Sequence, residues 1–447
     1  MPRLGRRAAL ATLPLAGMTL PLGGCGLWDR VFADEKRPLP GERRAVLPGE
    51  TELLPDEGIA GVEIALPPPV RNADWPVAGG APSNVMGHLD AGDRLAVAWR
   101  SSIGTGASRR QRLMAPPVVM DGRVFAADAE ARITALDLAT GRSLWRVSTR
   151  PEGASARVLG AGVATDGARV YVATGWAELL ALAPATGEVV WRRPLPSPSR
   201  GAVTTTGERV VVLCVEGQVV CADAASGATA WTHRGPAETT MLLAAPTPAI
   251  DQGAVLVGFG NGDLAVLRLE TGRVTWSEVL SGARGRPSIA DFSSVLARPA
   301  IDRGRGIVVG AGGVTMAIDM RSGRRIWERD LPGRESPWVA GDWIFLLSAA
   351  EELVCLSRAD GRARWVTALP RFRDAERRRD PILWTGPALV GDRLVLASSR
   401  GQAIAVSPYT GEIIGRQPLP DGVSVSPAVA DGTLLVLTDD ATIVALR

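Results

Sequence analysis

ITALDLATGRSLW, residues 133–145, decides the fold of this chain, because the same phrase returns six more times. Each copy has a glycine four residues before its last position, and every copy except the last ends in Trp, where the last has Gly415. The last positions lie 38 to 51 residues apart, a spacing typical of a repeat architecture. The other copies are LLALAPATGEVVW (179–191), VVCADAASGATAW (219–231), LAVLRLETGRVTW (264–276), TMAIDMRSGRRIW (315–327), LVCLSRADGRARW (353–365) and AIAVSPYTGEIIG (403–415).

Each repeat predicts a small antiparallel sheet of about four strands. An apolar run such as GRVFAAD (122–128) precedes the phrase, and both are rich in strand-forming residues and end in turn residues. Glycine supplies the positive φ of a tight turn, and Thr or Ser can bond the local backbone. The strand after the turn ends in Trp, whose ring can pack between neighbouring sheets. Because one such sheet cannot bury both faces alone, the sheets must stack radially, which predicts an all-β propeller.

The two ends of the chain set the expected number of blades. After the seventh copy, residues 432–447 supply a further strand pair, with no turn and Trp strand behind it. Residues 94–104 carry Trp99 without the strands that should precede it, and Trp99 lies 46 residues before Trp145. We therefore expect eight four-stranded antiparallel blades, closed by pairing of the N- and C-terminal strands, which removes an open sheet edge. The structural repeat tryptophans are Trp99, Trp145, Trp191, Trp231, Trp276, Trp327 and Trp365.

The composition agrees with this fold and argues against one class of partner. The chain of 447 residues has 51 Gly, 33 Pro and 46% hydrophobic residues, as expected of a turn-dense protein with a buried core between blades. Stacked repeats escape the size limit of a single compact core. The net charge is only +3 and the arginines are scattered, so no nucleic-acid partner is expected.

The start of the chain, residues 1–24, is predicted to be a lipoprotein signal peptide. A basic stretch (3–7) precedes an apolar run (8–22) that is too short for a transmembrane helix. The run ends in Leu-Gly-Gly-Cys, which resembles a bacterial lipobox, so Cys25 is the expected site of lipidation. The alternative is an ordinary signal peptide with a chance cysteine.

A lipidated cysteine, flexible tether and lead-in are expected over 25–92, ahead of the propeller at 93–447. The part up to residue 74 is rich in proline and charge and has little periodicity, which favours an extended, mobile segment. The remainder contains Trp75 and His88, residues that are unusual in a linker, and so predicts an ordered lead-in.

The histidines and carboxylates give little support to catalysis. His88 and His233 are the only histidines and lie in no metal-spaced cluster, so a histidine-based zinc site or a Ser-His-Asp hydrolase is poorly supported, and no metal is expected. Carboxylates recur at the repeat turns as Asp137, Asp223 and Asp319, where we expect them to cap the turn.

The cysteines beyond Cys25 are expected to be small core residues. Cys221 and Cys355 take a position that other copies fill with Ala or Val. A Cys214–Cys221 bridge stays open as an alternative in an oxidising compartment, although the hairpin register places the two off-pair.

Three loops depart from the repeat, and insertions in a propeller gather on one rim and form binding surfaces. The segments 280–302 and 368–387 stretch the repeat to 51 and 50 residues, and 233–251 contains the apolar patch 241–243. For this patch the alternative is an early start of the next strand, and for the arginines of 368–387 it is a solvated loop. These arginines are Arg371, Arg373, Arg377, Arg378 and Arg379.

The repeat resembles that of the quinoprotein-dehydrogenase-like propellers. That superfamily includes redox enzymes that use pyrroloquinoline quinone (PQQ) and the BamB-type propeller lipoproteins of the outer-membrane β-barrel assembly machinery. The chain is similar to the latter from Cys25 to Arg447, through the lipobox, the lead-in WPVAGGAPSNVMGH (75–88), the opening strand AWRSSIGTG (98–106) and the eight blades. PQQ enzymes carry a vicinal cysteine pair, which this sequence lacks, so no cofactor is expected.

The resemblance implies a non-enzymatic scaffold that is lipid-anchored in the outer membrane and faces the periplasm. Such a protein binds the periplasmic domains of the barrel insertase and assists delivery and insertion of unfolded outer-membrane proteins. The alternatives are a PQQ-dependent periplasmic dehydrogenase and a cell-envelope propeller with another partner.

The resemblance also implies partner-binding residues on two neighbouring loops, which supply an acidic residue and apolar or arginine residues. Asp291 best matches the acidic residue, and Leu242 and Leu243 fit the apolar contact. The family's arginine has no clear match, and Arg284 and Arg286, in the loop of Asp291, complete the candidate set.

Overall fold

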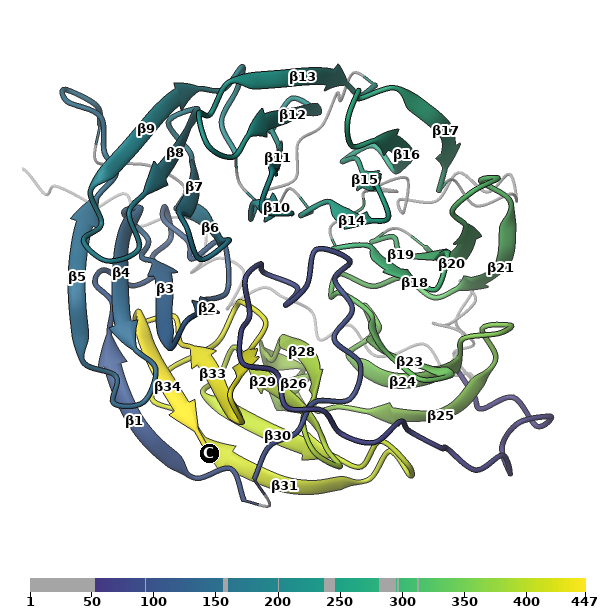
Figure 1. The fold of residues 1–447 in the computed structure, drawn as a ribbon. Helices are drawn as coiled ribbons and strands as arrows, with labels where there is room; N and C mark the ends of the chain where they lie inside the picture. The colour runs from purple at the N-terminus through teal and green to yellow at the C-terminus, as the bar shows by residue number, and fades with distance from the viewer. Residues whose placement is uncertain are drawn as a thin grey trace, which may run out of the picture. The chain divides into compact units, whose positions relative to one another are not determined.

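The computed structural model describes residues 53–447 except 93, 156–159, 200, 237–245, 281–294, 296 and 312. In this part of the chain, eight four-stranded antiparallel sheets and one two-stranded hairpin account for all named elements. Figure 1 shows the sheets arranged radially around an axis, which confirms the predicted eight-bladed β-propeller. Within the same residues, no helix is long and apolar enough to cross a membrane.

The blades are numbered here in chain order, and the strands of each run from the axis outwards (Figure 1). The first four blades are β2 (Val118–Met120), β3 (Arg123–Ala127), β4 (Arg132–Asp137), β5 (Ser143–Ser148); β6 (Ala161–Thr165), β7 (Val170–Thr174), β8 (Glu178–Leu182), β9 (Val189–Pro194); β10 (Thr204–Thr205), β11 (Arg209–Leu213), β12 (Gln218–Asp223), β13 (Thr229–Arg234); and β14 (Ala249–Asp251), β15 (Ala254–Gly258), β16 (Asp263–Arg268), β17 (Val274–Val279).

Blades five to eight repeat this order, and a hairpin separates blades six and seven. They are β18 (Ala300–Asp302), β19 (Arg305–Val309), β20 (Val314–Asp319), β21 (Arg325–Asp330); β22 (Trp338–Ala340), β23 (Trp343–Leu347), β24 (Glu352–Ser357), β25 (Ala363–Ala368); β28 (Trp384–Leu389), β29 (Leu394–Ser398), β30 (Gln402–Val406), β31 (Ile413–Pro418); and β32 (Ala428–Ala430), β33 (Thr433–Leu437), β34 (Thr442–Leu446), β1 (Val97–Ser102). The hairpin is β26 (Phe372–Asp374) and β27 (Arg379–Pro381).

Blade eight closes the ring, because its outermost strand comes from the N-terminal side of the propeller. β1 pairs antiparallel with β34, with Trp99 opposite Ala445 and Ser102 opposite Thr442. The predicted closure by N- and C-terminal strands is therefore confirmed, and the edge of β34 is covered.

The repeat tryptophan and the repeat glycine form the contact between neighbouring blades. The indole N–H of Trp231 in blade three donates to the carbonyl of Leu269 in blade four at 2.7 Å. A Cβ on Gly272, in the turn of blade four, would lie 2.6 Å from the Trp231 ring, so the turn approaches the ring closely only because it lacks a side chain. The same contact recurs for Trp99–Gly141, Trp145–Gly187, Trp191–Gly227, Trp276–Gly323, Trp327–Gly361 and Trp365–Gly411.

Gly415, the exception to the repeat, is explained by the closure. It lies in blade seven and faces blade eight, where β34 is followed only by Arg447 and not by a Thr/Ser-Gly turn. The next blade thus offers no turn glycine against which a Trp at position 415 could pack.

The described part of the predicted tether differs from the expectation, because residues 53–74 pack on the propeller. Ile59 and Ile64 are buried in one cluster with side chains of blades six and seven. Asp56 pairs with Arg329 at 3.0 Å and accepts from the backbone N–H of Ala363 at 2.6 Å. A proline-rich composition favours an extended chain, but such a chain can still bury isolated apolar side chains against a groove.

Residues 70–91, called the axial cap below, cover one end of the propeller axis (Figure 1). Trp75 exchanges two backbone hydrogen bonds with Val119 of β2 and stacks on Trp338 at 6.3 Å between ring centroids. The ordered lead-in predicted around Trp75 and His88 is thus part of this cap. Further bonds from the cap reach Thr165, Ile250, Ile301, Trp338 and Gly391 on blades two, four, five, six and seven.

Candidate functional site: the loop face

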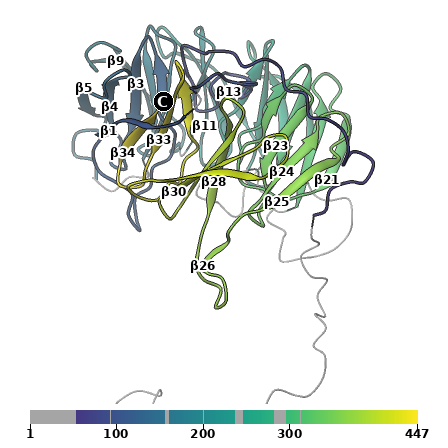
Figure 2. The same cartoon turned by 90° about the horizontal axis from the view of Figure 1, so that it is seen from below.

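The two faces of the propeller are built from different connections. The turn after the innermost strand lies on the cap side, where the N–H of Asp121 donates to Asp74. Because strands alternate in direction, the connections from one blade to the next lie on the opposite side. Figure 2 shows the cap and the β26–β27 hairpin on opposite sides of the ring. We call the side with the blade-to-blade connections the loop face; it carries all three long departures from the repeat.

The predicted partner-binding residues lie outside the described residues. Cys25 precedes them, and the others fall in the gaps at 237–245 and 281–294: Asp291, Leu242, Leu243, Arg284 and Arg286. What the structure describes is the attachment of the two loops. One leaves blade three at Gly235, whose N–H donates to Gly217, and the other enters blade five after Val295, whose N–H donates to Phe259. The two loops flank blade four, so they start and end as neighbours on the loop face.

The arginine-rich segment 368–387 forms the β26–β27 hairpin, which projects from the loop face (Figure 2). Arg373, Arg377, Arg378 and Arg379 are exposed, and Arg371 is half-buried at the base. The Arg377–Asp374 pair measures 3.9 Å and is exposed, a geometry that contributes little to stability.

A polar cluster at the loop-face end of the axis has no counterpart in the sequence-based predictions. This axial cluster consists of Arg298, Glu335, Ser336, Thr385 and Ser426, from the starts of blades five to eight. The Arg298 guanidinium donates to the hydroxyl of Ser426 at 3.1 Å, and its backbone N–H donates to the hydroxyl of Ser336 at 3.1 Å. The Glu335 carboxylate accepts from the hydroxyl of Thr385 at 2.9 Å.

Burial raises the pKa of Glu335, although its bonds from Thr385 and Gly386 and the charges of Arg298 and Arg334 oppose the shift. Glu351, which pairs with Arg334 at 3.0 Å, lies behind the cluster, and burial raises its pKa as well. The sequence signal for such a cluster is a polar residue at or just before the residue that precedes a proline opening an inner strand, as in Arg298-Pro299 and Ser426-Pro427. Nothing in a single repeat shows that these positions meet.

The donors for metal or quinone chemistry are not assembled in the described residues. There, no group of three or more His, Cys, Asp or Glu side chains could hold a metal ion. Cys214, Cys221 and Cys355 are buried free thiols within blades, and Val211, not Cys214, lies opposite Cys221. Burial raises the pKa of Cys214 to about 11 and that of Cys221 to about 12, so neither is a reactive thiolate.

The repeat carboxylates are turn caps. Asp137 accepts from the N–H of Thr140 at 2.9 Å and from its hydroxyl at 2.6 Å. Asp223 and Asp319 bond Ser226 and Ser322 in the same way. The hydroxyl bond is the largest cause of a pKa below the usual aspartate value at all three positions.

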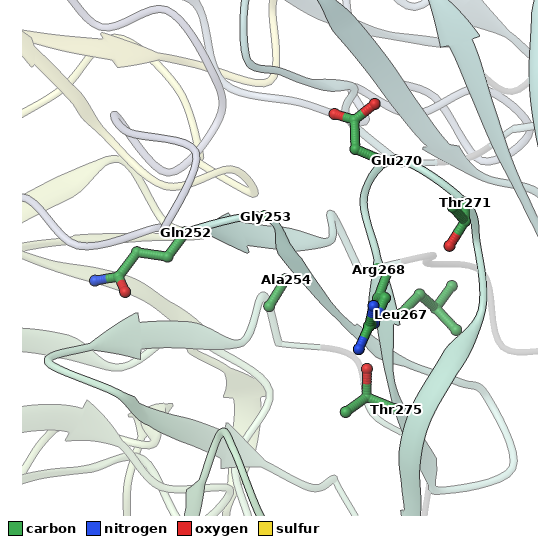
Figure 3. Close-up of a pocket in the computed structure, with 8 residues that line it drawn as sticks. All are labelled: Gln252, Gly253, Ala254, Leu267, Arg268, Glu270, Thr271 and Thr275. Atoms are coloured by element: carbon green, nitrogen blue, oxygen red, sulfur yellow. The ribbon is translucent and has the colours of Figure 1, made fainter.

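A hollow on blade four lies among Gln252, Gly253, Ala254, Leu267, Arg268, Glu270, Thr271 and Thr275. In Figure 3, Glu270 points away from Arg268 and Thr275, and Gln252 lies on the far side of Ala254. The polar groups therefore do not converge on one point, as a catalytic site would require.

Comparisons with known proteins agree with the propeller and separate its two families. The family described as "Outer membrane protein assembly factor BamB" matches residues 86–156, 129–367 and 373–447. The outer membrane protein assembly factor BamB of Alkalilimnicola ehrlichii is 31% identical over 360 residues, covering 78% of this chain and 90% of that protein.

Two solved structures share the fold. BamB from Moraxella catarrhalis matches with a TM-score of 0.66 and 19% identity, covering 79% of this chain and 99% of that one. A quinohemoprotein alcohol dehydrogenase from Comamonas testosteroni matches with a TM-score of 0.62 and 15% identity, covering 84% and 81%. At these identities the structures show the fold alone, whereas the sequence matches extend over most of the chain. The chain belongs to the family of the outer membrane protein assembly factor BamB.

Proposed function

We propose that this chain is a non-enzymatic scaffold of the outer-membrane protein assembly complex. Cys25 is its lipid anchor in the outer membrane, and the propeller faces the periplasm. The loop face docks on the periplasmic domains of the barrel insertase. The observation that supports this most is the asymmetry of the ring: the axial cap covers one face, and the long departures from the repeat lie together on the other.

The contact is proposed to involve the two loops that flank blade four. Asp291 gives a charge-assisted pair with a basic side chain of the insertase, and Leu242 and Leu243 give a buried apolar anchor. Arg284 and Arg286 supply basic contacts from the loop of Asp291. Loops held at both ends by a rigid scaffold are well suited to carry such contacts.

Client proteins are proposed to meet the outer edges of the blades. Outermost strands such as β9 and β17 have one unpaired edge and expose Val189, Val190 and Val274. An unfolded outer-membrane protein could add a strand there through backbone hydrogen bonds. The absence of binding between the isolated full-length protein and an unfolded barrel protein would contradict this part of the proposal.

A native pull-down tests the docking. The tagged lipidated protein is solubilised in mild detergent, and its partners are identified by mass spectrometry. We expect an integral outer-membrane barrel with large periplasmic domains, reduced for the Asp291→Asn and Leu242→Ala variants. Asp342→Asn and Val62→Ala are matched controls, because these exposed residues lie away from the two loops. Recovery of a cytochrome or a bound quinone instead of a barrel would favour the dehydrogenase alternative.

A further inference from the structure

The axial cluster contains a positive charge that the described protein groups satisfy incompletely. Arg298 extends from the start of β18 in blade five to Ser426 in blade eight. Its Nε is buried and has no hydrogen-bond partner among the described residues, and none of the described carboxylates lies within ion-pair distance of its guanidinium. A guanidinium does not lose its proton in a protein, so the charge remains and favours a negative partner.

The neighbouring acid compensates this charge poorly. Glu335 is turned to Thr385 and Gly386, at 2.9 and 3.3 Å, and not to Arg298. Glu351 is already paired with Arg334 and also accepts from the backbone N–H of Trp384 at 3.0 Å. Arg371, at the base of the hairpin, adds a further positive charge beside Glu351. The described groups at this end of the axis are thus three arginines and two glutamates.

Two hydroxyl groups are placed to help bind an anion. Ser336 and Ser426 each accept a hydrogen bond from Arg298, which leaves the proton of each hydroxyl available for another acceptor. Arg298 also keeps part of its surface exposed although protein surrounds it densely. A carboxylate that reaches Arg298 would therefore find a forked donor and two hydroxyl donors from three different blades.

We propose that the loop-face end of the axis is a binding site for an acidic side chain of a protein partner, held by Arg298, Ser336 and Ser426. An Asp or Glu side chain suits the site better than a chain terminus, because its carboxylate extends from the backbone and enters while the main chain stays on the surface. The site lies on the face that docks in the proposed function, and it deepens that proposal by naming a chemical group that the partner inserts.

A peptide measurement on the full-length protein tests the site directly. The probes are a fluorescent peptide with capped ends and one central Glu, and the same peptide with Gln. We expect the Glu peptide to bind more tightly, and Arg298→Gln to weaken it about tenfold or more. Arg378→Gln is the matched control, because Arg378 is an exposed arginine on the hairpin of the same face, and it should leave binding unchanged.

Glu335→Gln gives a test of opposite sign. Removing the carboxylate nearest in charge to Arg298 should strengthen binding of the Glu peptide several-fold, an effect that damage to the fold would not produce. Equal binding of the Glu and Gln peptides to the wild type, or unchanged binding by Arg298→Gln, would overturn the site. Equal competition by inorganic phosphate and by the Gln peptide's Glu counterpart would show a general anion site and would also overturn it.

Co-purification separates this proposal from the proposed function. If the wild type recovers the insertase and Arg298→Gln recovers as much, the acidic contact is wrong and the docking stands. If the wild type recovers no insertase while the Glu peptide still binds through Arg298, the docking is wrong and the site stands.

Discussion

At the residue scale, the blades are held together by a tryptophan on one blade and a glycine on the next. The glycine serves two purposes, because its turn needs a positive φ and its missing Cβ makes room for the indole. At Gly227 the φ is +71° and an added Cβ would lie 2.6 Å from Trp191, whereas at Gly432 the φ is +69° and nothing lies within 4 Å. These two positions separate backbone strain from steric conflict.

Gly227→Ala should therefore be much more harmful than Gly432→Ala. Gly432→Ala is expected to cost about 1–2 kcal/mol from the positive φ alone. Gly227→Ala carries the same strain and adds about 1–3 kcal/mol of overpacking against Trp191. Urea denaturation followed by tryptophan fluorescence measures both, and equal midpoints would show that the indole contact imposes no constraint.

Trp231→Phe tests the hydrogen-bonded half of the same contact. The substitution keeps an aromatic ring but removes the N–H that donates to Leu269 at 2.7 Å, and it leaves that carbonyl without the indole donor. We expect a loss of about 1–3 kcal/mol in the free energy of unfolding. Val274→Ala, an exposed residue on the next outermost strand, is the control and should change little. A thermal midpoint equal to that of the wild type would exclude a net contribution from the bond.

Local sequence predicts part of this residue-scale chemistry. The turn glycine and the Asp137–Thr140 cap follow from local backbone rules, and the structure shows both. The glycine's contact with the preceding blade is not local, so the repeat alone does not reveal it. The Arg298–Ser426 bond joins residues 128 positions apart, and no periodicity brings such a pair together.

At the element scale, the axial cap is an N-terminal segment that ties most of the blades together at the axis. Trp75 is 2% exposed and stacks on Trp338, whereas the side chain of Val70 at the start of the cap is exposed. We expect Trp75→Ala to destabilise the propeller by about 3–5 kcal/mol and Val70→Ala by less than about 0.5 kcal/mol. Thermal unfolding followed by near-ultraviolet circular dichroism compares them, and a small effect of Trp75→Ala would mean that the cap contributes little to the ring.

The same elements show why composition misplaced the end of the tether. Residues 53–74 have the proline and charge content of a linker, and an average over such a window does not register single buried residues. Ile59 and Ile64 nevertheless fill a groove between blades six and seven. The blade strands were predictable because each has several apolar residues at a repeated spacing.

Closure and decoration are expected to respond differently to deletion. Removing 442–447 takes away β34, leaves β1 unpaired and opens the ring, so the cooperative transition should be lost. Replacing 372–381 by a short Gly-Ser turn removes only the exposed hairpin, and the thermal midpoint should stay within a few degrees, about 0.5 kcal/mol. Calorimetry distinguishes the two, and a hairpin deletion as damaging as the truncation would mean that the hairpin is part of the core.

At the scale of the whole molecule, a ring of similar blades becomes asymmetric through its N-terminal segment and its blade-to-blade connections. Strand direction alternates, so every long connection falls on one face, while the cap occupies the other. Family membership and the blade count could be read from the repeat, but the axial cluster arises only when the starts of four blades meet. This convergence also buries ionisable groups, which gives the whole propeller a pH dependence.

Glu335→Gln should isolate one part of this pH dependence. Burial raises the pKa of Glu335 above its unfolded value, so its stabilising contribution is fully present below the unfolded pKa and is lost as pH rises through the folded pKa. At neutral pH the ionised carboxylate therefore destabilises the wild type relative to the neutral glutamine. The variant should be more stable than the wild type at about pH 8, and the difference should shrink as pH falls toward about pH 4, where both side chains are neutral. Other groups titrate in this window, among them His233, whose burial lowers its pKa and acts in the opposite direction, but they are common to both proteins and cancel in the difference. Thermal midpoints measured in parallel across this range give the result, and a difference that is constant with pH would show that Glu335 does not titrate between the folded and unfolded states as its burial requires.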